Sequence, residues 1–228
     1  MSEFMIMAAV IVPGLVIAIV FHEVAHGWVA LALGDPTAKE RRRLSFNPIR
    51  HADPVGTLVV PGLLAIAQGP IFGWAKPVPV RKDRLNNPRY GMMAVGAAGP
   101  AMNFLLALVG AIVLGGLVGT TEGPSSDGFA TFLDGIQYFI LINIFLALFN
   151  LLPIPPFDGS HIVEGLLPPK LAKRYGSLRS LGMFLLLPIV ALSWFAPELG
   201  IVENVVLPPV SWVMNHYIAV AEWVAGLF

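Results

Sequence analysis

Long apolar stretches alternate with short polar segments along the chain, and they predict membrane helices. The apolar stretches run over about Phe4–Leu33, Pro54–Trp74, Gly91–Thr121, Phe132–Leu152, Ser180–Pro197 and Asn204–Ala221. About 20 apolar residues are enough for a helix to cross the hydrocarbon core of a bilayer. The pattern predicts an all-α polytopic membrane protein with about five to six transmembrane or re-entrant helices.

The first and third stretches carry features that shape helix packing. At ~1.5 Å per residue, Phe4–Leu33 would be ~45 Å long, which exceeds the ~30 Å hydrocarbon core. Pro13 is expected to kink this helix. The third stretch is rich in small residues, which let neighbouring helices approach closely. These residues are Gly96, Gly99, Ala101, Gly110, Gly115 and Gly119.

Two segments depart from regular helix. Pro54–Trp74 is rich in glycine and proline and has basic segments on both sides. We therefore expect it to enter the membrane and return, although a full crossing that breaks the charge rule is the alternative. In Trp74–Tyr90, the sequence Lys-Pro-Val-Pro-Val should be extended, because proline disfavours helix for itself and the preceding residue. We predict a short β-strand or hairpin near residues 74–82.

Composition and charge narrow the class of protein further. Hydrophobic residues make up 56% of the chain and charged residues 12%, with a mean hydropathy of +0.76. The formal net charge is zero, so no global field indicates nucleic acid as a partner. The chain has no cysteine, which excludes thiol catalysis, cysteine-ligated zinc and disulfides.

The basic residues have an uneven distribution that predicts the orientation in the membrane. All 14 Lys and Arg fall in segments 39–50, 76–89 and 170–179, and the loops 122–127 and 198–203 contain none. By the positive-inside rule, the three basic segments face the cytoplasm, and the two other loops and the N-terminus lie outside.

The first stretch contains Phe21-His-Glu-Val-Ala-His-Gly-Trp28, which places three ionisable groups in an apolar helix. His22 and His26 are four residues apart and so lie on one helix face, where both can bind one tetrahedral zinc. Glu23 is suited to act as the general base on a metal-bound water. The alternatives are a polar helix–helix contact, exposure at the membrane surface, or a haem site.

A zinc site of this kind needs a third protein ligand, and Asn150-Leu-Leu-Pro-Ile-Pro-Pro-Phe-Asp-Gly-Ser-His161 offers two candidates. Its prolines must end the fourth helix, which puts Asp158 near the cytoplasmic face, on the same side as the histidines. Asp158 is equally suited to be the N-cap of a following helix. His161 is the rival third ligand.

Three motifs in this order resemble those of the site-2 protease family of intramembrane zinc metalloproteases. They are the His-Glu-Val-Ala-His motif, Gly99-Pro-Ala-Met-Asn103, and the proline-rich segment that ends in Asp158-Gly159. The resemblance covers about Ile11–Gly165 and fits the short, membrane-only form without a PDZ or CBS module. It implies one integral membrane protease domain over residues 1–228, with a catalytic core of about 4–167 and additional C-terminal spans at about 180–227.

The resemblance also implies a site and an activity. One Zn²⁺ per chain would be bound by His22, His26 and Asp158, with Glu23 as the base. The enzyme would hydrolyse single-span membrane proteins near the cytoplasmic face of a prokaryotic cytoplasmic membrane. The segment 74–80 would offer a strand edge to the substrate. Substrate or transition-state contacts would come from Asn103, Gly99 and Asn150.

Some alternatives stay open. Asn103 also suits a helix-packing amide. Ionisable residues within a membrane also mark ion paths, so a non-enzymatic metal transporter or channel is the second functional hypothesis. Clustered ligands and the absence of an internal repeat favour the enzyme. His51 and His216 are expected at the membrane surface or in packing, and the sequence indicates no oligomeric state.

Overall fold

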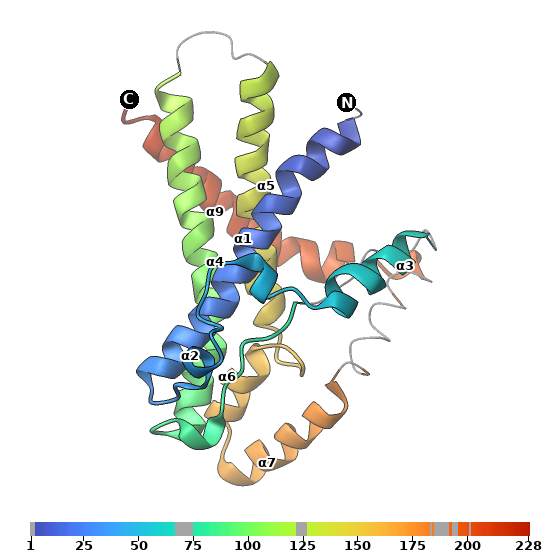
Figure 1. The fold of residues 1–228 in the computed structure, drawn as a ribbon. Coiled ribbons are helices and arrows are strands. Elements are labelled where there is room, and N and C mark those ends of the chain that lie inside the picture. Colours follow the sequence, from blue (N-terminus) through green and yellow to red (C-terminus); the bar gives the residue numbers. More distant parts are fainter. Residues whose placement is uncertain are drawn as a thin grey trace. The chain divides into compact units, whose positions relative to one another are not determined.

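The computed structural model describes residues 3–66, 75–121, 127–182, 184, 192, 196–200 and 202–228. The helices of this part of the chain are α1 (Glu3–Ala32), α2 (Thr37–Glu40), α3 (Val60–Ile66), α4 (Pro88–Gly119), α5 (Asp127–Asn150), α6 (Gly159–Leu166), α7 (Pro169–Ser177) and α9 (Leu207–Ala225), as Figure 1 shows. Short 3-10 or π turns occupy Pro48–Arg50, Pro54–Val59, Lys82–Arg84, Leu178–Ser180, Pro197–Leu199 and Val202–Val206. The prediction of a helical protein is confirmed.

Three described helices are long and apolar enough to cross a membrane, which is fewer than the five to six elements predicted. They are Ile11–Ala32 within α1, all of α4, and all of α5. The predicted stretch Ser180–Pro197 lies mostly outside the described residues. The sixth stretch corresponds to α9, which is helical but carries Asn215, His216 and Glu222 and is not among the three.

The predicted re-entrant stretch is described only in its first part. It begins with the π turn Pro54–Val59 and continues as α3, and the Asp53 side chain accepts hydrogen bonds from the first free N–H groups. The two pieces, of 6 and 7 residues, together rise about 20 Å, which is short of the ~30 Å hydrocarbon core. Residues 67–74 lie outside the described part, so re-entry stays a prediction.

The predicted β-strand or hairpin near residues 74–82 is wrong. Residues 75–81 are extended, but the described chain contains no β-strand. A ladder needs a regular series of backbone donors, and two prolines remove them at Pro77 and Pro79. The remaining donors bond elsewhere: the Lys76 N–H to the His51 carbonyl at 2.8 Å, and the Val78 N–H to the side chain of Glu23 at 2.7 Å.

The chain groups into two compact units. Unit 1 comprises residues 1–18, 100–150 and 200–228, and unit 2 comprises residues 19–99 and 151–199. The core of unit 1 consists of Ala107, Ala111, Leu114, Ile140, Ile144, Val210 and Ala221. A Cβ added to Gly115 would lie 2.2 Å from the Ala221 carbonyl oxygen, and one added to Gly110 would lie 2.9 Å from Ile140. Small residues therefore permit close helix contacts, as predicted.

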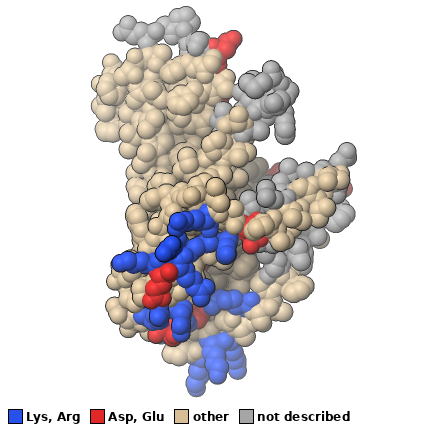
Figure 2. Space-filling view, viewed as in Figure 1, with Lys and Arg blue, Asp and Glu red and all other residues tan. Residues whose placement is uncertain are grey.

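Unit 2 contains all 14 Lys and Arg residues of the chain, and Figure 2 shows a cluster of Lys and Arg side chains on the surface. Buried Asp35 ties the end of α1 to the segment before α4, because it accepts hydrogen bonds from the backbone N–H groups of Thr37 and Arg81. Burial alone would raise the pKa of Asp35. The two backbone hydrogen bonds, together with a third from the Thr37 hydroxyl, outweigh the effect of burial and hold the pKa below its usual range. The carboxylate is therefore ionised and bonded at neutral pH.

Candidate metal centre

Two histidines and one aspartate of unit 2 converge at the end of α1. His22 and His26 are buried one turn apart, and their ring centroids are 4.6 Å apart. Asp158 Oδ2 lies 3.0 Å from His22 Nε2 and 3.2 Å from His26 Nε2. Each of the three residues offers one potential ligand atom, and these three atoms all lie within 4.8 Å of one another.

The His26 ring is held in an orientation that suits a metal ligand. Its Nδ1 lies 2.7 Å from the Val95 carbonyl oxygen. A carbonyl only accepts hydrogen bonds, so Nδ1 must carry the proton, and Nε2 of the neutral ring then has a free lone pair. Metal-bound histidines usually make this kind of contact through their other nitrogen.

Asp158 faces the histidines rather than capping a helix. It stands at the N-cap position of α6, yet its side chain makes no capping hydrogen bond. Of the two readings that the sequence left open, the geometry favours the one in which Asp158 is free to act as a ligand. Gly159 makes the preceding turn possible, because a Cβ there would lie 2.2 Å from the Leu151 carbonyl oxygen. The turn includes a cis peptide bond between Pro155 and Pro156.

One face of α4 brings the three side chains together. A Cβ on Gly99 would lie 2.5 Å from atoms of both His22 and His26, and a Cβ on Gly96 would lie 2.9 Å from the Asp158 carbonyl oxygen. Positions 96 and 99 are three residues apart and so share one helix face. Only the absence of side chains lets the α4 backbone approach both α1 and α6. Gly99 was predicted as a site residue and Gly96 was not, although their spacing of three residues indicates a shared helix face.

Cationic side chains hold α6, the helix that follows Asp158. Glu164 accepts from Lys82 at 2.8 Å and from Arg179 at 2.7 Å. Arg89 donates to the carbonyl oxygens of Gly165 and Leu167 at the end of α6. Burial alone would raise the pKa of Glu164, but the two ion pairs outweigh it and lower the pKa. In the sequence these cations indicated only the topology, and their role in holding α6 was not predicted.

Glu23 is fixed by the extended segment that follows the predicted re-entrant stretch. Its Oε2 accepts a hydrogen bond of 2.7 Å from the Val78 N–H, and the structure gives Oε1 no hydrogen-bond partner among the described residues. Buried Arg43 donates to the carbonyl oxygens of Lys76 and Pro77, which holds the same segment in place. One carboxylate oxygen is thus positioned, and the other is available to a water molecule.

His161 does not join the group of ligand atoms. Its Nδ1 lies 3.2 Å from Arg179 Nη2, so it accepts a hydrogen bond from a cation. Burial, reinforced by Arg179, lowers the pKa of His161 to about 4. The described structure therefore brings Asp158, rather than its rival, to the two histidines.

The other candidate residues have local partners. Fully buried Asn103 donates to the Ala18 carbonyl at 3.2 Å and to Asn143 at 2.9 Å, both within unit 1. Asn150 donates to the Leu146 carbonyl within its own helix. Their predicted substrate contacts stay predictions.

The two remaining histidines lie in different environments. His51 is 2% exposed and donates from Nε2 to the Ser45 carbonyl, so it is a buried residue rather than a membrane-surface one. His216 is exposed on α9 and contacts the Trp212 ring and carbonyl. Neither is part of the group that His22, His26 and Asp158 form.

The donor set fits zinc better than the hard cations. Two imidazole nitrogens and one carboxylate oxygen are a usual three-ligand set for zinc, whereas calcium and magnesium prefer oxygen ligands. Tetrahedral ligands ~2.0–2.1 Å from zinc lie about 3.3 Å from one another. The observed nitrogen–oxygen separations of 3.0 and 3.2 Å are close to that value.

Comparison with known proteins gives a consistent result. The pattern of peptidase family M50 matches residues 113–189, a range that includes Asp158. YwhC of Bacillus subtilis strain 168 is 38% identical over 207 residues, which is 88% of each chain. Rip2 of Mycolicibacterium smegmatis is 26% identical over 180 residues, or 79% of this chain and 66% of Rip2. MJ0611 of Methanocaldococcus jannaschii is 32% identical over 145 residues, or 64% of each chain.

These three relatives are named as zinc metalloproteases. No solved structure matches the chain.

Proposed function

We propose that this chain, which belongs to peptidase family M50 and is an integral membrane metalloprotease of the site-2 kind, cleaves single-span membrane proteins near the cytoplasmic face. One observation carries the proposal: His22, His26 and Asp158 place two nitrogens and one oxygen together, and Glu23 follows His22 directly in the chain. This set supplies three ligands and a general base. It leaves one coordination position for water or substrate.

The chain's own residues have distinct tasks in this reaction. His22 Nε2, His26 Nε2 and an Asp158 carboxylate oxygen would hold the zinc, which when bound would polarise the scissile carbonyl and activate water. Glu23 accepts the proton of that water, and then delivers it to the leaving amine. The Val78 N–H fixes Oε2 of Glu23, so the proton moves through Oε1. The Val95 carbonyl keeps His26 in the tautomer that binds metal.

We also propose the orientation and extent of the enzyme. The confinement of all 14 Lys and Arg to unit 2, which also holds the metal centre, supports a site towards the cytoplasm and an N-terminus outside. The protease domain extends over residues 1–228, and one zinc is bound per chain. A prokaryotic cytoplasmic membrane is the proposed location.

The test separates metal binding from catalysis. Zinc content and cleavage of a single-span reporter are measured for the wild type, Glu23→Gln, His22→Ala and Asp158→Ala. We expect Glu23→Gln to keep zinc and lose cleavage, and the two ligand variants to lose both. Retained cleavage by purified Glu23→Gln would refute the mechanism.

Two further results would redirect the assignment. Undiminished zinc in Asp158→Ala would remove this residue from the ligand set and favour His161. Zinc flux in proteoliposomes without any peptide cleavage would support the metal transporter instead.

A further inference from the structure

The cations of unit 2 fall into two groups. The first group is bonded within the protein: Arg43, Arg50, Arg81, Lys82, Arg84, Arg89 and Arg179 donate to carboxylates or backbone carbonyls. The second group makes no ion pair or side-chain hydrogen bond within the described residues. It includes Lys39, Arg41, Arg42, Lys76 and three residues of α7, which are Lys170, Lys173 and Arg174.

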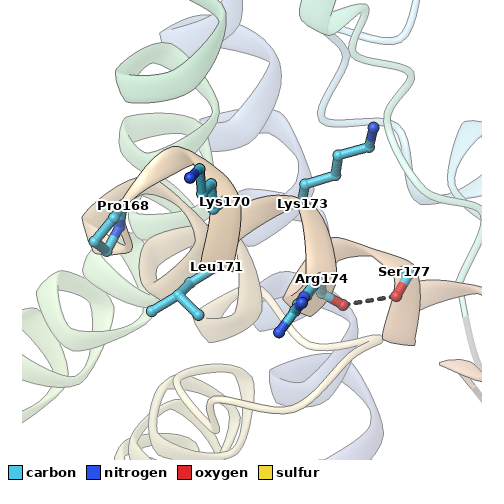
Figure 3. A pocket seen from close by; sticks show the side chains of 6 residues that line it. All are labelled: Pro168, Lys170, Leu171, Lys173, Arg174 and Ser177. Carbon is cyan, nitrogen blue, oxygen red and sulfur yellow. Dashed lines mark hydrogen bonds between the residues drawn. The ribbon is translucent and has the colours of Figure 1, made fainter.

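The three cations of α7 lie on one side of the helix. Positions 170, 173, 174 and 177 share one face, because an α-helix makes a turn every 3.6 residues. Together with Pro168 and Leu171 they line an open groove of about 770 Å³. Figure 3 shows the side chains of these six residues. There is no acidic residue from Pro168 to Ser180, so no carboxylate on this segment balances the charge.

Exposed leucines lie beside the cations. Leu171 is 49% exposed and Leu178 is 39% exposed, and the spacing of seven puts both on the same side of the segment. The opposite side faces the protein: Tyr175 donates to the Pro153 carbonyl, and a Cβ added to Gly176 would lie 3.7 Å from the Glu164 carboxylate. The segment thus has a fixed inner side and an outer surface of cations and leucines.

We propose that α7 is an interfacial helix that binds the headgroups of anionic phospholipids, with its leucines in the acyl region. Amphipathic helices of this composition lie in the membrane interface, and each Lys or Arg near an anionic surface strengthens the attraction. The occupant is a lipid rather than a soluble acidic partner, because apolar side chains stand beside the cations in a protein that is already in the membrane. The proposal needs only that membrane location, and it goes beyond the proteolytic function.

Lipid binding is tested with a fluorescent probe on α7. The chain has no cysteine, so Leu171→Cys can be labelled with an environment-sensitive fluorophore at a single site. The labelled protein is placed in nanodiscs of phosphatidylcholine alone or with one-third phosphatidylglycerol. Quenching by acrylamide, which is uncharged, reports access from water. We expect quenching to fall at least twofold when phosphatidylglycerol is present.

The charge variant should abolish this dependence. Replacing Lys170, Lys173 and Arg174 by Gln should weaken the preference for anionic lipid roughly 100-fold, from the usual contribution of each cation. The matched control replaces Lys39, Arg41 and Arg42 by Gln, which removes the same charge from another unpaired set. It should retain the response at residue 171. An equal loss in this control would overturn the proposal, because total charge would then explain the effect.

Other arms distinguish the sources of negative charge. Inorganic phosphate or an acidic peptide, each added to phosphatidylcholine discs, should leave quenching unchanged. Protection by phosphate alone would identify a soluble anion site, and protection by the peptide would identify a protein partner; either result overturns the lipid proposal. A second label at Ser177→Cys guards against local damage at residue 171. The readout requires neither zinc nor cleavage, so it does not depend on the proposed function.

Discussion

Replacing Gly99 by alanine should release the metal while leaving the fold intact. The new Cβ would lie 2.5 Å from His22 Cε1 and Nε2 and from His26 Nε2. Ordinary contact begins at 3.4 Å, so the rings or the helix must move by about 0.9 Å, the difference between the two distances. Metal–ligand distances hold within about 0.2 Å, so a shift of this size breaks the ligand geometry.

The rings can swing away from the new methyl group, because they are the ends of side chains. That movement relieves the clash and separates the ligands, which is why the loss should fall on zinc rather than on folding. Disturbing the surroundings of a metal ligand usually costs 10–100-fold in affinity, and direct displacement should cost at least roughly 100-fold. Zinc is measured by competition with a chelator and by metal analysis of the purified protein.

Gly116→Ala is the matched control on the same helix. A Cβ at Gly116 meets no atom within 4 Å, so this variant should keep zinc and gain about 0.5–1 kcal/mol of helix stability. If Gly99→Ala bound zinc as tightly as Gly116→Ala, the close approach of α4 to the two imidazoles would not exist, and the account of the site would fail.

Three other perturbations test the supports of the centre. Gly159→Ala should destabilise the protein by about 1–3 kcal/mol, because the new Cβ clashes with the Leu151 carbonyl oxygen. The control Gly128→Ala, whose new Cβ meets no atom within 4 Å, should not destabilise it. Thermal unfolding measures the difference between the two variants. Val78→Pro removes the N–H that holds Glu23. It should lower kcat roughly tenfold, which corresponds to the free energy of one charge-assisted hydrogen bond, and leave the zinc content unchanged. An unaltered kcat would show that this bond is dispensable. Asp35→Asn should cost about 1–3 kcal/mol at neutral pH by leaving a buried donor unpaired. Folding lowers the pKa of Asp35, so the ionised carboxylate stabilises the fold fully above the ordinary pKa of about 3.9, and this stabilisation is lost as the pH falls below that value. The difference in stability between wild type and Asp35→Asn should therefore shrink in acid. A difference that stays constant with pH would contradict the lowered pKa.

Much of the proposed site could be inferred from the sequence because its candidate ligands obey local rules. The spacing of His22 and His26 puts both on one face of a helix, and the prolines before Asp158 end the preceding helix, whatever the rest of the fold does. The choice between ligand and N-cap for Asp158 required long-range geometry. It depends on Gly96 and Gly99 bringing α4 against two other helices, and a sequence shows small residues without showing what they touch.

The strand near residue 78 shows where local reasoning failed. The prolines correctly predicted an extended backbone, but a strand also needs a partner, and the donors of this segment bond to Glu23 and to the His51 carbonyl instead. His51 was expected at the membrane surface, but it is buried. The prediction failed because His51 lies in a loop and not in a periodic element. Contacts between distant loops leave no periodic signal in the chain.

The three proposed zinc ligands leave the ribosome at very different times. Asp158 follows His22 by 136 residues. At about 5–20 residues per second, this separation lasts on the order of ten seconds of synthesis. Throughout that interval the nascent chain has both imidazoles and Glu23 but lacks the Asp158 carboxylate. On the proposed function, the protease is therefore inert while its first helices insert, and it cannot cleave neighbouring chains at the translocon before its own core is complete.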